Sequence, residues 1–173
     1  MDCTVNHSHI SIFSLYLGQL RQLLTKIECY QTEDTNILQA RLAPDMLPLC
    51  TQVEIAASFA LRASCPIAQV AVVSFIKNER SFAALQDQLQ QTIDFLARLK
   101  AKHTEPFVGE ICDMAGPVKV CLSAGEFLHC FALPNFFFHI SMVYAIARLH
   151  DIPVSKGDFD GFHQYAAGFS FEK

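Results

Sequence analysis

The sequence lacks most of the features that identify a function directly. Its 173 residues include no tryptophan, and only 17% of them are charged. The 13 basic residues are scattered, and the densest group is the short stretch 100–102. Nucleic-acid binding relies on a basic patch that neutralises phosphates. We therefore expect no nucleic-acid partner.

The seven cysteines also lack a recognisable pattern. None forms a CxxC motif, and none is spaced from a histidine as in a zinc finger. We interpret them as reduced thiols in a cytoplasmic protein, with Cys50 and Cys130 buried near the centre of the core. The segment MDCTVNHSHISIF at the N-terminus has neither the basic region nor the clean apolar run of a secretory signal.

The sequence is rich in apolar residues. Hydrophobic residues make up 51% of the chain, and 15 residues are phenylalanine. The length suits one domain over residues 1–173, which is large enough for an independent core. The surplus of apolar area predicts a homodimer. The alternative is a monomer whose aromatic tail, residues 154–171, covers that surplus.

The spacing of apolar residues predicts four helices. Apolar positions recur at intervals of three and four residues, which is the signature of an amphipathic helix. The helices are expected over residues 8–30, 45–63, 81–101 and 122–150. Asp45 and Ser81 stand where a helix cap belongs. The fold class is therefore all-α, a four-helix bundle.

The connection between the last two helices breaks the helical pattern. Gly116-Pro117 is a turn signal, and side chains alternate from Val118 to Leu122. We expect a short hairpin or an extended loop there, before the last long helix. Up-down-up-down is the default order of the helices, and the length of the 102–122 connection makes a crossover equally compatible.

The segment 122–150, LSAGEFLHCFALPNFFFHISMVYAIARLH, contains polar residues on an otherwise apolar helical face. Asn135 and His139 lie four residues apart, so they stack one turn above the other. We expect both to be buried and hydrogen-bonded to each other or to the helix at 45–63, because unpaired buried polar groups are costly. Pro134 predicts either a kink or a split into two helices, with the proline in the first turn of the second.

The stretch 127–149 is long enough to span a membrane. His129, Pro134, Asn135, His139 and Arg148 interrupt it, and its polar residues are arranged as on a core-facing helix. We therefore expect no membrane partner.

Two segments, ARLAPDMLPLCTQV at 40–53 and FALPNFFFHISMVYAIARLHDIPVSKGDF at 131–159, resemble the DUF1993 family, which is grouped with the DinB-like bundles. The resemblance covers nearly the whole chain. It implies a metal-binding four-helix bundle, often dimeric, in a group that includes hydrolases and thiol transferases. The metal site of such bundles has one histidine on the second helix and two, four residues apart, on the last.

His139 matches the second histidine of that last-helix pair, and Asn135 stands in place of the first. The helix at 45–63 has no histidine and offers only Gln52 and Glu54 as polar residues. We therefore expect no metal cofactor. A divalent metal remains possible through His139 with Glu54 or His129 as substitute ligands; Asp45 is a further substitute whose position also suits a helix cap.

The preferred hypothesis is a DinB-like bundle that binds a small molecule in a pocket lined by Gln52, Asn135, Phe138 and His139. One alternative is a metal-dependent hydrolase or transferase that uses His139 with substitute ligands. The other is a structural protein whose role is homodimerisation.

Overall fold

The computed structural model describes residues 9–31, 36–102, 109–166 and 169. It is mostly helical, and four of its helices are long amphipathic segments that pack against one another. The helices are α1 (His9–Tyr30), α2 (Leu49–Ile67), α3 (Phe82–Lys102), the short α4 (Ala124–Glu126), α5 (Leu133–Leu149) and α6 (Lys156–Asp160). A 3-10 turn covers Ile37–Gln39, a π-helical turn covers Phe127–Ala132, and two strands, β1 (Glu110–Ala115) and β2 (Val118–Ser123), form a hairpin.

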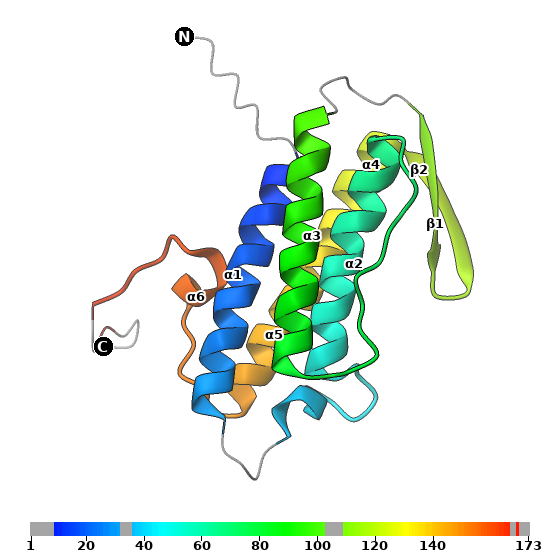
Figure 1. Ribbon diagram of the computed structural model, residues 1–173. Coiled ribbons are helices and arrows are strands. Elements are labelled where there is room, and N and C mark those ends of the chain that lie inside the picture. Colours follow the sequence, from blue (N-terminus) through cyan, green and yellow to red (C-terminus); the bar gives the residue numbers. More distant parts are fainter. Residues whose placement is uncertain (1–8, 32–35, 103–108, 167–168, 170–173) are drawn as a thin grey trace.

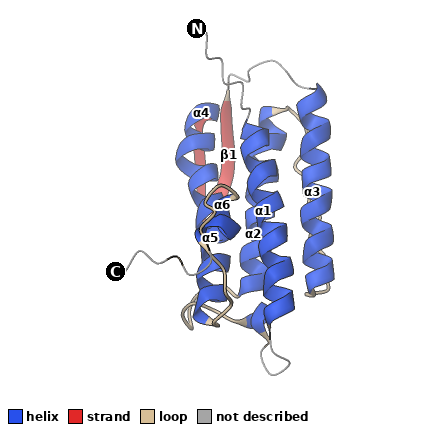
Figure 2. Cartoon of the chain, turned by 90° about the vertical axis from the view of Figure 1, so that its left-hand side faces the viewer, coloured by secondary structure: helices blue, strands red, loops and turns tan. Residues whose placement is uncertain are grey.

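The long helices α1, α2, α3 and α5 form the bundle (Figure 1). In the view turned by 90°, α1 and α2 lie between α3 and α5 (Figure 2). Along the chain α1 and α2 are antiparallel, whereas α2 and α3 point the same way, because the segment 68–81 runs back along the length of the bundle (Figure 1). The crossover therefore lies between α2 and α3, not in the 102–122 connection where the sequence allowed it.

The second helix begins later than its sequence pattern predicts. Pro48 is the N-cap residue of α2, and the helix extends to Ile67. Asp45 lies in an exposed turn before the helix, so its expected capping role was wrong. The physical reason is that the residue before a proline avoids the helical conformation, which keeps Leu47 out of the helix. Ser81 does cap α3, and its hydroxyl accepts a hydrogen bond from the Ala84 backbone amide at 3.1 Å.

The long apolar segment divides at Pro134, as one of the two alternatives predicted. A π-helical turn precedes α5, and Pro134 lies in the first turn of α5, where its missing amide hydrogen costs little. By length and composition the stretch Ala124–Leu149 is also able to cross a membrane. It packs against α2 along the bundle and buries Phe136, Ile140 and Val143.

The connection before this segment is a β-hairpin, so the label all-α was too narrow. β1 and β2 pair antiparallel, with Ala115 opposite Val118 and Gly116 at a φ of 60° in the turn. A positive φ suits glycine, which has no side chain to clash. The hairpin lies at one end of the bundle beside α2 and α4 (Figure 1).

Two expectations about the cysteines were wrong. Cys112 and Cys121 form a disulfide, because the hairpin register places them directly opposite each other with 4.1 Å between their Cα atoms. Cys130 is exposed, since the π-helical turn carries it on the outer side of the segment. Cys50 is buried as expected, and the other described cysteines, including Cys65 and Cys29, are free thiols.

The chain after α5 returns across α1 (Figure 1). Phe159 of α6 contacts Tyr16 of α1, with 5.8 Å between ring centroids. Among the tail residues that the structure describes, Phe162 remains 71% exposed and Phe169 remains 52% exposed. These described residues therefore conceal only part of the apolar surplus. Phe171, which the expected cover also included, lies outside the described residues.

Candidate functional site

The bundle core brings together two polar side chains that lie 87 positions apart in the sequence. Gln52 comes from the first turn of α2 and His139 from the middle of α5, and both are buried. The Nδ1 atom of His139 lies 2.6 Å from the Oε1 atom of Gln52. His139 is thus bonded to the second long helix, as the sequence predicted.

The hydrogen bonds of Gln52 fix the protonation of the imidazole. The other end of the Gln52 carboxamide lies 3.1 Å from the Leu47 carbonyl oxygen, which is only an acceptor. The atom facing Leu47 must therefore be the NH₂ group, and the atom facing His139 must be the carbonyl oxygen. It follows that Nδ1 of His139 carries the proton and Nε2 carries a lone pair.

The lone pair on Nε2 is not sealed inside the core. The His139 side chain makes no second hydrogen bond within the described part of the chain. The buried polar atoms that lack a partner there are His9 Nε2 and Ser64 Oγ. His139 is 8% exposed, and its Nε2 atom is not among the buried atoms without a partner. We infer that the small accessible area of the residue includes Nε2. Nε2 is therefore an acceptor that no described residue uses.

The ring of His139 is neutral at physiological pH. Burial, assisted by the positive charge of Arg62, lowers the pKa of His139 from 6.5 to about 4. Both causes disfavour the imidazolium form, since burial strips its hydration and Arg62 repels it. Near pH 7 the site therefore offers an uncharged lone pair and no formal positive charge from this ring.

Aromatic side chains surround the imidazole. Phe59 of α2 stacks with His139 at 5.7 Å between centroids, and Phe138 meets it edge to face at 5.3 Å. The Arg62 guanidinium carbon lies 4.4 Å from the Phe59 ring centroid. Phe138 is 49% exposed, so it offers an accessible apolar surface next to the His139 ring.

Arg62 also links this site to the hairpin. Its Nε atom lies 2.6 Å from the Asp113 carboxylate, and its Nη2 atom donates to the Met114 carbonyl at 2.9 Å. The guanidinium that holds β1 against α2 is thus the same group that lowers the pKa of His139.

The other residues expected at the site lie elsewhere or have other partners. Asn135 is half-buried, and its carboxamide donates to the Phe131 carbonyl one turn earlier at 2.8 Å. Its expected hydrogen bond to His139 or to the second helix was wrong, because a side-chain amide readily satisfies its own helix backbone. His129 is exposed and lies near His9, where its charge adds to burial in lowering the pKa of His9.

Glu54 lies on a different side of α2. Its carboxylate is 3.8 Å from Arg80, and its backbone carbonyl accepts from Gln88 of α3 at 3.4 Å. Burial raises the pKa of Glu54, and the Arg80 charge opposes that effect. Glu54 follows Gln52 by two positions, a turn of about 200° around a helix, so both cannot face His139.

These positions do not fit the three-histidine metal centre that the DinB-like resemblance implies. On α2 the nearest polar residue is a glutamine that is already bonded to Nδ1 of His139 and to Leu47. Asn135 is committed to its own helix, and the Arg62 cation repels positive charge at the imidazole. A carboxamide is moreover a weak ligand for a transition metal. One imidazole nitrogen remains where three would be needed.

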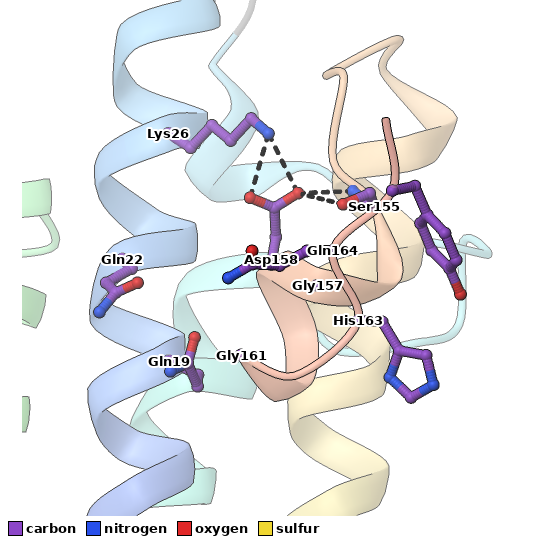
Figure 3. Close-up of a pocket in the computed structure, with 10 residues that line it drawn as sticks. Gln19, Gln22, Lys26, Ser155, Gly157, Asp158, Gly161, His163 and Gln164 are labelled. Atoms are coloured by element: carbon purple, nitrogen blue, oxygen red, sulfur yellow. Dashed lines mark hydrogen bonds and ion pairs between the residues drawn. The ribbon is translucent and has the colours of Figure 1, made fainter. Parts of the chain in front are cut away.

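A second concave region lies between α1 and the tail. This cavity of about 540 Å³ is lined mainly by polar side chains, among them Gln19, Gln22, Lys26 and His163 (Figure 3). Lys26 contacts both carboxylate oxygens of Asp158 at 3.0 Å. Burial alone would raise the pKa of Asp158, but hydrogen bonds from Ser155 and Lys26 outweigh it and lower the pKa.

The charges of this cavity are compensated within the protein. Asp158 also accepts from the Ser155 backbone amide at 2.6 Å, which closes a capping box at the start of α6. His163 Nδ1 lies 2.5 Å from the Asp160 carboxylate. The Lys26–Asp158 contact docks α6 on α1, and the other two contacts stabilise α6 and the residues after it. Because these polar groups already have structural partners, this cavity is the weaker of the two candidate sites.

Sequence reasoning missed Phe59 and Arg62. Phe59 follows Gln52 by seven residues, which is two turns along the same face of a helix. That spacing was the available signal, since Gln52 had been named as a pocket-lining residue of the second helix. The reach of Arg62 to the hairpin had no comparable signal, because it depends on where β1 lies in space.

The geometry defines a class of protein, a mostly helical four-helix bundle whose core holds the Gln52–His139 hydrogen bond. Over residues 6–160 the sequence matches the family described as a domain of unknown function, DUF1993, and the chain belongs to that family. It is similar in structure to a DinB family member protein from Shewanella denitrificans, with a TM-score of 0.75 and 24% sequence identity, over 91% of this chain and 92% of that one. That likeness shows the fold. No curated protein matches the chain.

Proposed function

We propose that the protein binds a small uncharged molecule at His139, with Gln52 as the positioning residue. The observation that carries the proposal is the pair of hydrogen bonds made by Gln52. They hold the proton on Nδ1 and leave the lone pair of Nε2 for a ligand. A fixed acceptor on the rigid helices of a bundle positions a ligand more accurately than a loop residue would.

The surroundings define the chemical class of the ligand. An anion gains little there, because the imidazole is neutral near pH 7 and Arg62 is already paired with Asp113. A cation also gains little there, because the neutral imidazole and the Arg62–Asp113 pair together offer no negative charge. A molecule with one O–H or N–H donor and an apolar ring satisfies Nε2 and also covers the exposed edge of Phe138. Small-molecule sites commonly combine such an apolar contact with a few polar groups that set orientation.

Asn135 contributes to this site as a neighbour and not as a ligand contact. Its amide hydrogen is used by Phe131, so we assign it the role of holding the π-helical turn against α5. The alternative of a metal-dependent hydrolase or transferase has less support, since the donor set around His139 lacks partners. A homodimer stays a prediction, with the exposed Phe138 and Leu149 among the apolar side chains available for a contact.

A titration with two probes of similar shape tests the proposal. Phenol carries an aromatic ring and one O–H donor, whereas toluene carries the ring alone. We expect phenol to shift the Nε2 resonance of His139 in ¹⁵N spectra and to bind roughly fivefold more tightly, since one hydrogen bond is worth about 1 kcal/mol. Toluene should contact the aromatic side chains without moving the Nε2 resonance.

His139→Leu serves as the matched variant, because leucine fills the same place in the core with an apolar side chain and removes the acceptor. In this variant the preference for phenol over toluene should disappear. The proposal fails if phenol leaves the His139 resonance unchanged and instead shifts the side-chain amides of Gln19 and Gln22, which would make the α1–α6 cavity the binding site.

A further inference from the structure

The hairpin displays its two cysteines on the side that faces away from the bundle. Side chains alternate between the two faces of a strand. On β1, Ile111 is buried and Asp113 is bonded to Arg62, so these two define the inner face. Glu110 and Cys112 therefore belong to the outer face, and Cys121 joins them because it pairs directly with Cys112.

These three outer residues form a compact set of potential metal ligands. Their ligand atoms all lie within 4.8 Å of one another, and all three residues are exposed. A Glu110 carboxylate oxygen is 3.6 Å from Sγ of Cys112. In the present state the two sulfur atoms are joined in a disulfide and are unavailable as thiolates.

We propose that the hairpin is a reversible dithiol site which, once reduced, binds one thiophilic divalent cation such as Zn²⁺ through Cys112, Cys121 and Glu110. A thiol reductant breaks the S–S bond by exchange. Two electrons and two protons pass to the cysteines while two reductant thiols become a disulfide. Binding of the cation then releases the two thiol protons, because the ligands are thiolates.

The backbone geometry suits both states. Two thiolates on a tetrahedral zinc ion lie roughly 3.8 Å apart for Zn–S bonds of about 2.3 Å. Opposed cysteines with Cα atoms 4.1 Å apart reach that separation by rotating their side chains. The carboxylate supplies a third ligand of a type that zinc accepts, and water completes the coordination. A site with an open position and full exposure binds and exchanges its metal rapidly.

The hairpin does not depend on the disulfide for its position. Arg62 anchors Asp113 and Met114, and Ile111 is buried in the core. At the other end of the strands, Ser123 forms a capping box with Glu126, which fixes the passage from β2 into α4. The strand register that places Cys112 opposite Cys121 is therefore retained on reduction.

Cobalt titration of the full chain tests the site. The protein is reduced with a phosphine, transferred under nitrogen into buffer free of reductant, and titrated with Co²⁺ as a spectroscopic substitute for Zn²⁺. We expect a thiolate-to-cobalt charge-transfer band and tetrahedral d–d bands that saturate at one Co²⁺ per chain, and their loss on addition of Zn²⁺. The oxidised protein should show neither set of bands.

Variants distinguish this pair from the other thiols of the chain. Cys112→Ser/Cys121→Ser should abolish the bands, whereas the matched variant Cys29→Ser/Cys130→Ser should keep them. Glu110→Gln should weaken Co²⁺ binding about tenfold with the charge-transfer band retained. The proposal is overturned if reduced wild-type protein gives no bands, if the Cys112→Ser/Cys121→Ser variant keeps them, or if Glu110→Gln binds as tightly as wild type.

Discussion

Replacement of Gln52 by leucine tests whether this side chain sets the tautomer of His139. Gln52 is 1% exposed and makes two hydrogen bonds, one to Nδ1 of His139 at 2.6 Å and one to the Leu47 carbonyl at 3.1 Å. Leucine has a similar volume, so the main consequence is the loss of polar partners. An unpaired buried donor costs about 1–3 kcal/mol.

A change of tautomer in the His139 imidazole reduces that cost. The ring can move its proton from Nδ1 to Nε2, which we infer to reach solvent, and leave only an unpaired acceptor at Nδ1. We therefore expect a loss of about 2 kcal/mol in the free energy of unfolding, which is about 1 kcal/mol, the lower end of that range, for each of the two lost partners. We also expect a switch to the Nε2–H tautomer. Leu47 is partly exposed, so water replaces some of what its carbonyl loses.

Two measurements check this prediction. Urea unfolding gives the change in stability, and long-range ¹H–¹⁵N correlation spectra of the histidine rings at pH 7 give the tautomer. Gln88→Leu is the matched control, because Gln88 is a buried glutamine that bonds to Glu54 and is remote from His139 in the hydrogen-bond network. The reasoning is refuted if Gln52→Leu retains the Nδ1–H tautomer or loses less than about 0.5 kcal/mol.

Three further predictions concern the pKa of His139 and the packing of the tail. The unfolded chain protonates His139 near pH 6.5 and the folded chain near pH 4, so the free energy of unfolding should fall as the pH is lowered through this window. The loss, on the order of 2 kcal/mol after allowance for solvent screening, should be absent when the stability of His139→Leu is measured over the same pH range. Arg62→Leu should raise the pKa of His139 above its wild-type value, as measured by NMR titration; an unchanged pKa would show that burial alone sets it. Gly157→Ala should destabilise the protein by about 1–3 kcal/mol and expose the α6 amides to hydrogen exchange, because the new Cβ would lie 2.1 Å from the His163 carbonyl oxygen. Gly125→Ala, which has open space around its Cβ position, should not be destabilised.

The periodicity of apolar residues was sufficient to predict the four long helices, because each helix carries a stripe of apolar residues at intervals of three and four. Their ends were less predictable where local chemistry competes. Asp45 looks like a cap in sequence, but Pro48 determines where α2 begins. The direction of α3 relative to α2 had no sequence signal, since it depends on the path of the segment 68–81 along the bundle.

The candidate site was predictable in part. The sequence placed Gln52 and His139 in one expected pocket and allowed a hydrogen bond from His139 to the second helix, and the structure brings these two residues within hydrogen-bond distance. Asn135 shares the same sequence face, yet it is turned to its own backbone. The disulfide escaped prediction because cysteine spacing alone does not reveal strand register, and a hairpin turn at Gly116 was needed to place Cys112 opposite Cys121.

The most direct test of the account is a crystal structure of the protein with bound phenol. The account predicts the hydroxyl group of phenol about 2.7–3.0 Å from Nε2 of His139, with Gln52 still bonded to Nδ1 and the phenol ring against Phe138. Phenol found only in the cavity between α1 and α6, with the surroundings of His139 unchanged, would contradict the claim that this histidine is the ligand-binding group.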